Sequence, residues 1–159
     1  MIPHVLSTLA LFGLALLLGA TVYESVVMAP NYERDIPASI DLARQFLKRT
    51  TPANYFRLLT PFTQLLVLAS VVASWQIAAA RWRLLTALGV LVLLEVITFT
   101  FHYPRLAIMF KAPMSEDTAR LRRAARQWAI GNLVRVFLLV VAFLAALQAV
   151  TTLAMRLGQ

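Results

Sequence analysis

The sequence predicts an all-α fold, a four-helix transmembrane bundle with short amphipathic segments in loops 1 and 3. Three observations support this fold class. Of the 159 residues, 60% are hydrophobic and only 14% are charged, whereas soluble domains are about 45–50% apolar and about 25% charged. Four apolar runs are each long enough to cross a hydrocarbon core of about 30 Å as a helix. Two polar, proline-containing segments and the short connection Arg81-Trp82-Arg83 separate these runs. We therefore expect a single transmembrane domain over residues 1–159.

The charged residues indicate which partners to expect. The formal net charge is +8, but most of the 15 Lys and Arg residues flank the apolar runs, as is typical of side chains that anchor helices to lipid headgroups. We therefore expect the lipid bilayer as a partner and no nucleic acid. Cysteine is absent, which excludes disulfides and thiolate metal sites. The expected location is a bacterial inner membrane, with the chain as a multi-pass integral protein.

Each span has its own boundary signals. We predict membrane-spanning helices at about residues 5–28, 56–80, 84–101 and 128–153. Pro30 is expected to end the first helix, and Pro61 lies in the first turns of the second, where proline is best tolerated. The segment Arg81-Trp82-Arg83 is expected to connect the second and third helices. A connection this short makes those two helices antiparallel neighbours.

Both longer loops carry amphipathic segments. In the first loop, residues 39–49 have apolar side chains at helical spacing, which predicts a short helix lying at the membrane interface. These side chains are Ile40, Ala43, Phe46 and Leu47. In the other longer loop, loop 3, Ser115-Glu116-Asp117 is typical of a helix start. The arginine-rich segment that follows is expected to run directly into the fourth span. Residues 105–110 are expected to form a broken or interfacial turn after the third span.

Polar side chains inside the spans gather at one depth. Four spans put both termini and residues 81–83 on one side of the membrane and the two longer loops on the other. All four spans then contribute polar groups to the half of the bundle nearer the loops: Glu24, Gln64, Glu95, Thr98, His102, Asn132 and Arg135. Ionisable groups inside a membrane are costly and are by default functional candidates. Trp128, Asn132 and Arg135 recur at i, i+4 and i+7, which places them on one helix face.

Arg135 is the centre of this predicted site. We expect it to pair with Glu24, with Glu95 or with both. The remaining polar groups complete a hydrogen-bonded pocket in this interpretation: Gln64, His102 and Asn132. The alternative is a structural role, in which a buried ion pair fixes the register of the helices and the amides join them.

Three other side chains have more than one interpretation. Tyr103 and Trp128 fit either an interfacial aromatic belt or the lining of the pocket. His102 as a metal ligand is disfavoured, because the only other histidine, His4, lies on the opposite side of the membrane. We therefore expect neither a metal nor another cofactor.

Several motifs invite comparison with a known family. They are Tyr23-Glu24 with Pro30-Asn31, Tyr55-Phe56 with Pro61, Tyr103-Pro104, and the Trp-x-x-x-Asn-x-x-Arg pattern of Trp128, Asn132 and Arg135. On these residues the chain resembles the anthrone oxygenase-like family, small four-helix membrane proteins that are mostly of unknown function. The resemblance covers essentially the full length, and the last pattern is its most specific part. Leu133 stands where many family members carry a histidine.

The resemblance implies a reaction. A few relatives oxidise an anthrone to an anthraquinone without a metal or flavin, which requires a base, a cation beside the enolate and an apolar cavity that admits oxygen. Transferred to this chain, it implies Glu95 or Glu24 as the base and Arg135 with Asn132 as stabilisers of the enolate. The implied aromatic lining is Tyr23, Tyr103 and Trp128.

Two further classes of function stay open from the sequence. The chain fits a binding or accessory protein whose pocket holds a lipid, a quinone or a partner helix without making a bond. It also fits a proton-linked carrier that uses Glu95 and Arg135, although four spans without visible inverted repeats disfavour an autonomous transporter. A homo-oligomer is compatible with each of these functions.

Overall fold

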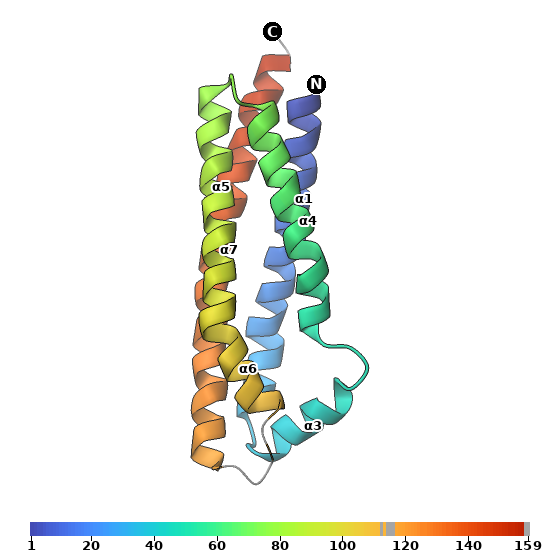
Figure 1. The fold of residues 1–159 in the computed structure, drawn as a ribbon, viewed down its shortest axis with the longest axis vertical. Coiled ribbons are helices and arrows are strands. Elements are labelled where there is room, and N and C mark those ends of the chain that lie inside the picture. Colours follow the sequence, from blue (N-terminus) through green and yellow to red (C-terminus); the bar gives the residue numbers. More distant parts are fainter. Residues whose placement is uncertain (112, 114–116, 158–159) are drawn as a thin grey trace.

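The computed structural model describes residues 1–111, 113 and 117–157, and these residues form an all-α bundle, as predicted. Within them, four helices are long and apolar enough to cross a membrane, which fits a multi-pass integral membrane protein. These four helices are Ile2–Glu33, Pro52–Ala73, Ala78–Phe110 and Thr118–Leu157. They stand side by side, with the two chain ends at the same end of the bundle (Figure 1).

The first and third of these helices are each composed of two α-helices joined by a π-helix. The segments are α1 (Ile2–Tyr23), η1 (Glu24–Met28) and α2 (Ala29–Glu33) in the first, and α5 (Ala78–Ile97), η2 (Thr98–His102) and α6 (Tyr103–Phe110) in the third. Pro30 and Pro104 are the second residues of α2 and α6. The prediction that Pro30 ends the first helix is therefore wrong. In a regular α-helix the proline ring collides with the carbonyl four residues earlier, and a wider turn directly before it gives that carbonyl room.

Side chains that directly follow these prolines bind carbonyls in the π turns. Asn31 Nδ2 donates to the Val27 carbonyl at 2.7 Å, and Arg105 Nη1 donates to the Phe101 carbonyl at 3.0 Å. These side chains thereby bind backbone carbonyls in the distorted turns next to the prolines, where backbone groups within a membrane need partners. The third helix therefore continues to Phe110, and residues 105–110 are helical where the sequence predicted a broken turn.

The connection between the second and third spans lies earlier than predicted. α4 (Pro52–Ala73) starts with a capping box between Thr51 and Asn54, and residues 74–77 separate its last residue from the start of α5. Arg81-Trp82-Arg83 therefore lie in the first turns of α5, not in the turn. Arg81 reaches back from α5 to donate to the Trp75 carbonyl at 3.0 Å, so this arginine stabilises the turn from within the next helix. α4 and α5 are antiparallel neighbours, as predicted (Figure 1).

The fourth span is the longest helix of the described residues. α7 (Thr118–Leu157) has 40 residues and carries the arginine-rich segment directly into the membrane span, as predicted. Asp117 Oδ1 accepts a hydrogen bond from the Ala119 backbone N–H at 2.8 Å, which caps the start of this helix. The predicted helix start also included Ser115 and Glu116, which lie outside the described residues.

Small residues bring the four long helices together. α1 packs against α4 and α7, and α5 packs against the same two helices. Ala10, Ala87, Ala142 and Ala146 are completely buried in the core that these helices share, which is typical of helix contacts in membranes. Large apolar side chains instead cover the outer surface, among them Phe12, Phe62 and Phe137. An outer surface of this kind matches lipid chains.

Replacing Gly13 by alanine is expected to destabilise the bundle by about 1–3 kcal/mol. A Cβ at this position would lie 2.5 Å from Thr63 Oγ1 and 3.2 Å from Thr63 Cβ, so rotation of the threonine cannot relieve the clash and α1 must move away from α4. Thermal unfolding in detergent, followed by circular dichroism, measures the effect. Gly19→Ala in the same helix is the matched control, because its Cβ would meet nothing within 4 Å. Equal melting temperatures for the two variants would contradict this close contact.

The amphipathic helix of the first loop closes the loop-side end of the bundle. α3 (Ala38–Phe46) confirms the predicted short helix. Ile40 is completely buried in a cluster with Tyr32, Met109 and Trp128, and Arg44 Nε donates to the Met109 carbonyl at 2.7 Å. Phe46, which was expected on the same apolar face, is 81% exposed. α3 is thus held against α2 and α6, and the chain between α3 and α4 is positioned beside the polar half of the bundle.

Candidate functional site

Two adjoining cavities lie in the half of the bundle nearer the loops. The first, which we call the mid-bundle cavity, has a volume of about 240 Å³ and is lined mainly by apolar residues of the four long helices, together with Glu95. The second, the loop-side cavity, has a volume of about 530 Å³ and is lined by the ends of the helices and by residues 47–54. Both are partly open. Five residues line both cavities: Phe56, Arg57, Thr98, Tyr103 and Arg135.

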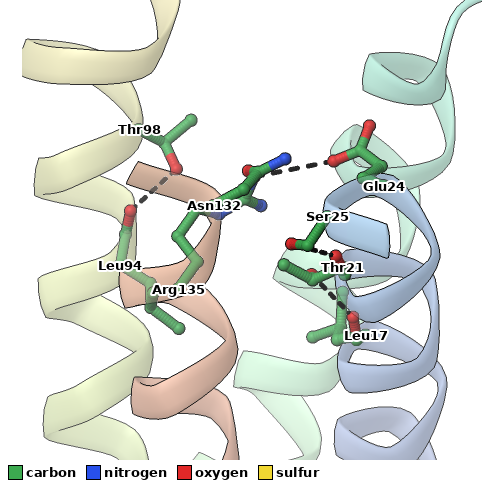
Figure 2. A network of polar contacts seen from close by, with 8 residues as sticks. All are labelled: Leu17, Thr21, Glu24, Ser25, Leu94, Thr98, Asn132 and Arg135. Carbon is green, nitrogen blue, oxygen red and sulfur yellow. Dashed lines mark hydrogen bonds and ion pairs between the residues drawn. The ribbon is translucent and has the colours of Figure 1, made fainter. Parts of the chain in front are cut away.

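Arg135 lies between the two cavities. Its Nη1 is 3.9 Å from Glu24 Oε2 and donates to Asn132 Oδ1 at 3.1 Å, and its guanidinium lies over the Phe56 ring, 4.9 Å from the centroid. Asn132 precedes Arg135 by one helical turn, so both side chains leave α7 on the same face. Figure 2 shows this face directed to Glu24 on the first helix. The predicted pairing of Arg135 with Glu24 is thus present.

The hydroxyl groups near Glu24 and Arg135 donate to carbonyls of their own helices, so they do not donate hydrogen bonds to the Glu24 carboxylate. Thr21, Ser25 and Thr98 each donate to the carbonyl four residues earlier, at 2.7–2.8 Å (Figure 2). A hydroxyl that bonds its own helix in this way is not available as a donor to a neighbouring side chain. Arg135 is therefore the group that balances the negative charge of Glu24. The Asn132 amide also faces the carboxylate, but it makes no hydrogen bond with it.

The two π turns position the polar groups that face α7. Glu24 is the first residue of η1 and His102 is the last residue of η2, and both are buried. The His102 ring packs against Gly131 of α7, where an added Cβ would lie 3.0 Å from His102 Cε1 and 2.7 Å from Phe101 Cε1. A glycine at this position therefore lets the imidazole approach the α7 backbone. π turns within α-helices often occur at functional sites.

Several buried polar atoms in this region have no hydrogen-bond partner in the described structure: both ring nitrogens of His102, Asn132 Nδ2 and Arg135 Nε. His102 is only 1% exposed. Most buried polar atoms in proteins are hydrogen-bonded, and each exception calls for an explanation. His102 and Arg135 also line the loop-side cavity, so these unpaired nitrogens are buried directly beside it.

Glu95 differs from Glu24 in having no partner. It is half-buried, lines the mid-bundle cavity together with Arg135, and makes no hydrogen bond or ion pair with any residue that the structure describes. Its charge acts on Arg135 only at longer range. An unpaired carboxylate and a paired guanidinium thus border the same hollow, with the mainly apolar Leu91, Leu94 and Leu139 around them.

Of the other predicted site residues, some line the cavities and some do not. Tyr103 lines both cavities, and Trp128 lines the loop-side cavity, where it is 3% exposed and lies 5.5 Å from the Tyr32 ring. Trp128 is therefore part of the interior and not of a lipid-facing belt. Tyr23 is 57% exposed on the outside of the bundle. One residue along a helix turns a side chain by about 100°, so Tyr23 points away when Glu24 points inward.

Gln64 also lies outside the residues that line the two cavities in the described part of the chain. It is half-buried on α4, beside Thr63, which points to Gly13 of α1. The sequence placed Gln64 at the correct depth but could not tell how far α4 is rotated about its axis.

Many of the lining residues were not predicted as part of the site. The basic and aromatic ones that matter for the chemistry include Lys48, Arg49, Phe56, Arg57 and Lys111. The basic residues among them were grouped with the charges that face lipid headgroups. Arg57 had a recognisable signal, because it follows Tyr55-Phe56 and already lay inside the predicted second span; the structure starts this helix earlier, at Pro52. The others depend on how the segment after α3 returns to the bundle.

No group of three or more His, Cys, Asp or Glu side chains is arranged to hold a metal ion within the residues described. Comparison with protein-family models, with curated proteins and with solved structures found no match to this chain. The chemistry of the cavities is therefore the basis on which a function is inferred.

Proposed function

We propose that this protein binds a small aromatic molecule, polyketide-like or quinone-like, in the two adjoining cavities and oxidises it with molecular oxygen. The reaction class is the one implied by the resemblance to the anthrone oxygenase-like family and needs neither a metal nor a flavin. The observation that supports it best is the placement of Glu95 without a polar partner in the same hollow as Arg135. A bacterial inner membrane, the expected location, would supply apolar substrate and oxygen directly from the lipid phase.

The size and lining of the cavities suit such a ligand. Pockets for small molecules typically measure about 300–1,000 Å³ and combine apolar walls with a few polar groups. The loop-side cavity, at about 530 Å³, is in this range, and the mid-bundle cavity extends it by about 240 Å³. Phe56 and Tyr103 border both cavities and present aromatic surfaces to a planar ring.

The two carboxylates have different roles in this proposal. Glu24 is held by Arg135 and orients it. Glu95 is unpaired, so it is the base that removes a proton from the activated ring carbon, and Arg135 balances the negative charge that develops on the enolate oxygen. Molecular oxygen then bonds to that carbon. The resulting hydroperoxide loses water, so that one CH₂ group and one O₂ give one carbonyl and one H₂O.

Oxygen consumption tests this proposal. Purified protein in phosphatidylcholine nanodiscs, given anthrone under an oxygen electrode, is expected to take up one O₂ per anthrone and to form the anthraquinone chromophore faster than empty nanodiscs do. A chelator should leave the rate unchanged. Tight binding of anthrone without oxygen uptake would instead indicate an accessory binding role. If the protein neither binds anthrone nor takes up oxygen, only the structural role of the ion pair remains. The residues that the proposal uses belong to one chain, so it requires no second copy.

A further inference from the structure

The loop-side cavity is more basic than the proposed reaction requires. Besides Arg135, four cationic residues line it: Lys48, Arg49, Arg57 and Lys111. None of these four side chains makes an ion pair or hydrogen bond with a residue that the structure describes. Glu24 is the only carboxylate in the lining among the described residues, and it is already paired with Arg135. The cavity therefore presents several positive charges that nothing in the described chain neutralises.

These cations come from separate parts of the chain. Lys48 and Arg49 follow α3, Arg57 lies in the second turn of α4, and Lys111 ends α6. The hydrogen bond from Arg44 to the Met109 carbonyl holds α3 against the end of α6, which keeps the first and last of these groups beside the same opening. Cations that only anchored single helices to headgroups would have no reason to border one cavity.

We propose that this opening is an anion subsite, and that the ligand is an amphiphile with an acidic group at one end and an apolar, ring-bearing body. The inference rests on the proposed function and specifies its ligand. The acidic end is held by Arg57 with Lys48, Arg49 and Lys111, at the level where headgroups lie. The body extends past Arg135 into the mid-bundle cavity, where Leu91 and Leu94 surround it. Arg57 borders both cavities and so marks the junction between the two parts of the ligand.

This arrangement also explains the order of the polar groups along the cavities. The four cations lie at the opening. His102 and Arg135, which have nitrogens without hydrogen-bond partners among the described residues, lie deeper. The carboxylate Glu95 borders only the mid-bundle cavity, whereas Lys48, Arg49 and Lys111 border only the loop-side cavity. An acidic ligand is thus fixed by one end and presents its neutral body to the groups proposed to react with it. An anionic group near the reacting carbon would oppose the negative charge that develops on the enolate.

A matched pair of probes tests the subsite. Naphthalene-2-carboxylate and the neutral naphthalene-2-methanol are titrated by calorimetry into protein in phosphatidylcholine nanodiscs, with empty nanodiscs subtracted. The acid is expected to bind at least about 10-fold more tightly than the alcohol, because a charge-assisted contact is worth roughly one order of magnitude in affinity. Arg57→Gln should remove most of this preference and leave the affinity for the alcohol unchanged. Arg122→Gln, an exposed arginine of α7 that does not line either cavity, should change neither affinity.

The outcomes separate this inference from the proposed function. Equal affinity for acid and alcohol, with no effect of Arg57→Gln, would overturn the anion subsite while ligand binding itself stands. Binding of neither probe, together with no uptake of oxygen, would overturn the proposed function as well. Adding phosphatidylglycerol to the nanodiscs distinguishes the source of the anion. Displacement of the acid by this lipid assigns the subsite to an acidic headgroup, and persistence of binding assigns it to a small acidic molecule.

Discussion

Glu24→Leu is expected to destabilise the bundle by about 3–5 kcal/mol, the usual result of removing one partner from a buried ion pair. The change leaves the Arg135 guanidinium, which is 3.9 Å from Glu24 in the intact protein, without a paired carboxylate among the described residues. Its remaining contacts are the Asn132 amide and the Phe56 ring, and Glu95 acts on it only at longer range. A guanidinium cannot become neutral by losing its proton. Thermal unfolding in detergent, followed by circular dichroism, measures the loss.

Arg135→Leu is the complementary change and should cost less, about 1–3 kcal/mol. The Glu24 carboxylate can take up a proton when its partner is removed and thereby avoid an unpaired charge. The double variant Glu24→Leu with Arg135→Leu should recover stability relative to Glu24→Leu alone, since both charges are gone. If the loss of stability in the double variant equals the sum of the losses in the two single variants, the two side chains are not coupled. Arg135→Leu should also abolish oxygen uptake in a folded protein, which the structural role alone does not predict.

Glu95→Gln is expected to lower the rate of oxygen uptake about 10²–10⁴-fold, the range typical of removing a general base. The amide keeps the shape of the side chain but cannot accept the proton. Stability should change little, because Glu95 makes no hydrogen bond or ion pair that the substitution could break. Initial rates with anthrone under an oxygen electrode, together with melting temperatures, give both quantities.

Glu33→Gln is the matched control for this rate measurement. Glu33 is exposed at the end of α2 and lines neither cavity, so its replacement should leave the rate unchanged. A fully active Glu95→Gln protein would assign the base elsewhere. If Glu24→Gln were the variant that lost activity while remaining folded, Glu24 would be the base and Glu95 a bystander in the cavity lining.

The contrast between Glu24 and Glu95 shows how far the sequence could predict the site. Both carboxylates were assigned to the correct half of the bundle, because the depth of a residue in a membrane helix follows from counting residues along the span. Asn132 and Arg135 were likewise placed on one face from their spacing. Which carboxylate meets Arg135 depends on how each helix is rotated about its axis. That rotation is set by contacts such as Gly13 with Thr63 and Gly131 with His102, which are between helices.

Composition and periodicity by themselves determined that the chain forms four apolar helices in one bundle, that its polar groups lie in the loop-side half, and that α3 is amphipathic, since each of these follows from local sequence. Only the tertiary structure decided that Pro30 and Pro104 lie within continuous helices behind π turns, that Tyr23 points outward, and that Arg57 with Lys48, Arg49 and Lys111 borders a cavity. The orientation of Tyr23 and the gathering of the four cations depend on contacts between helices, which the local sequence does not contain. The prolines are accommodated within their own helices by a wider turn, a change of backbone geometry that the hydrophobic periodicity does not reveal.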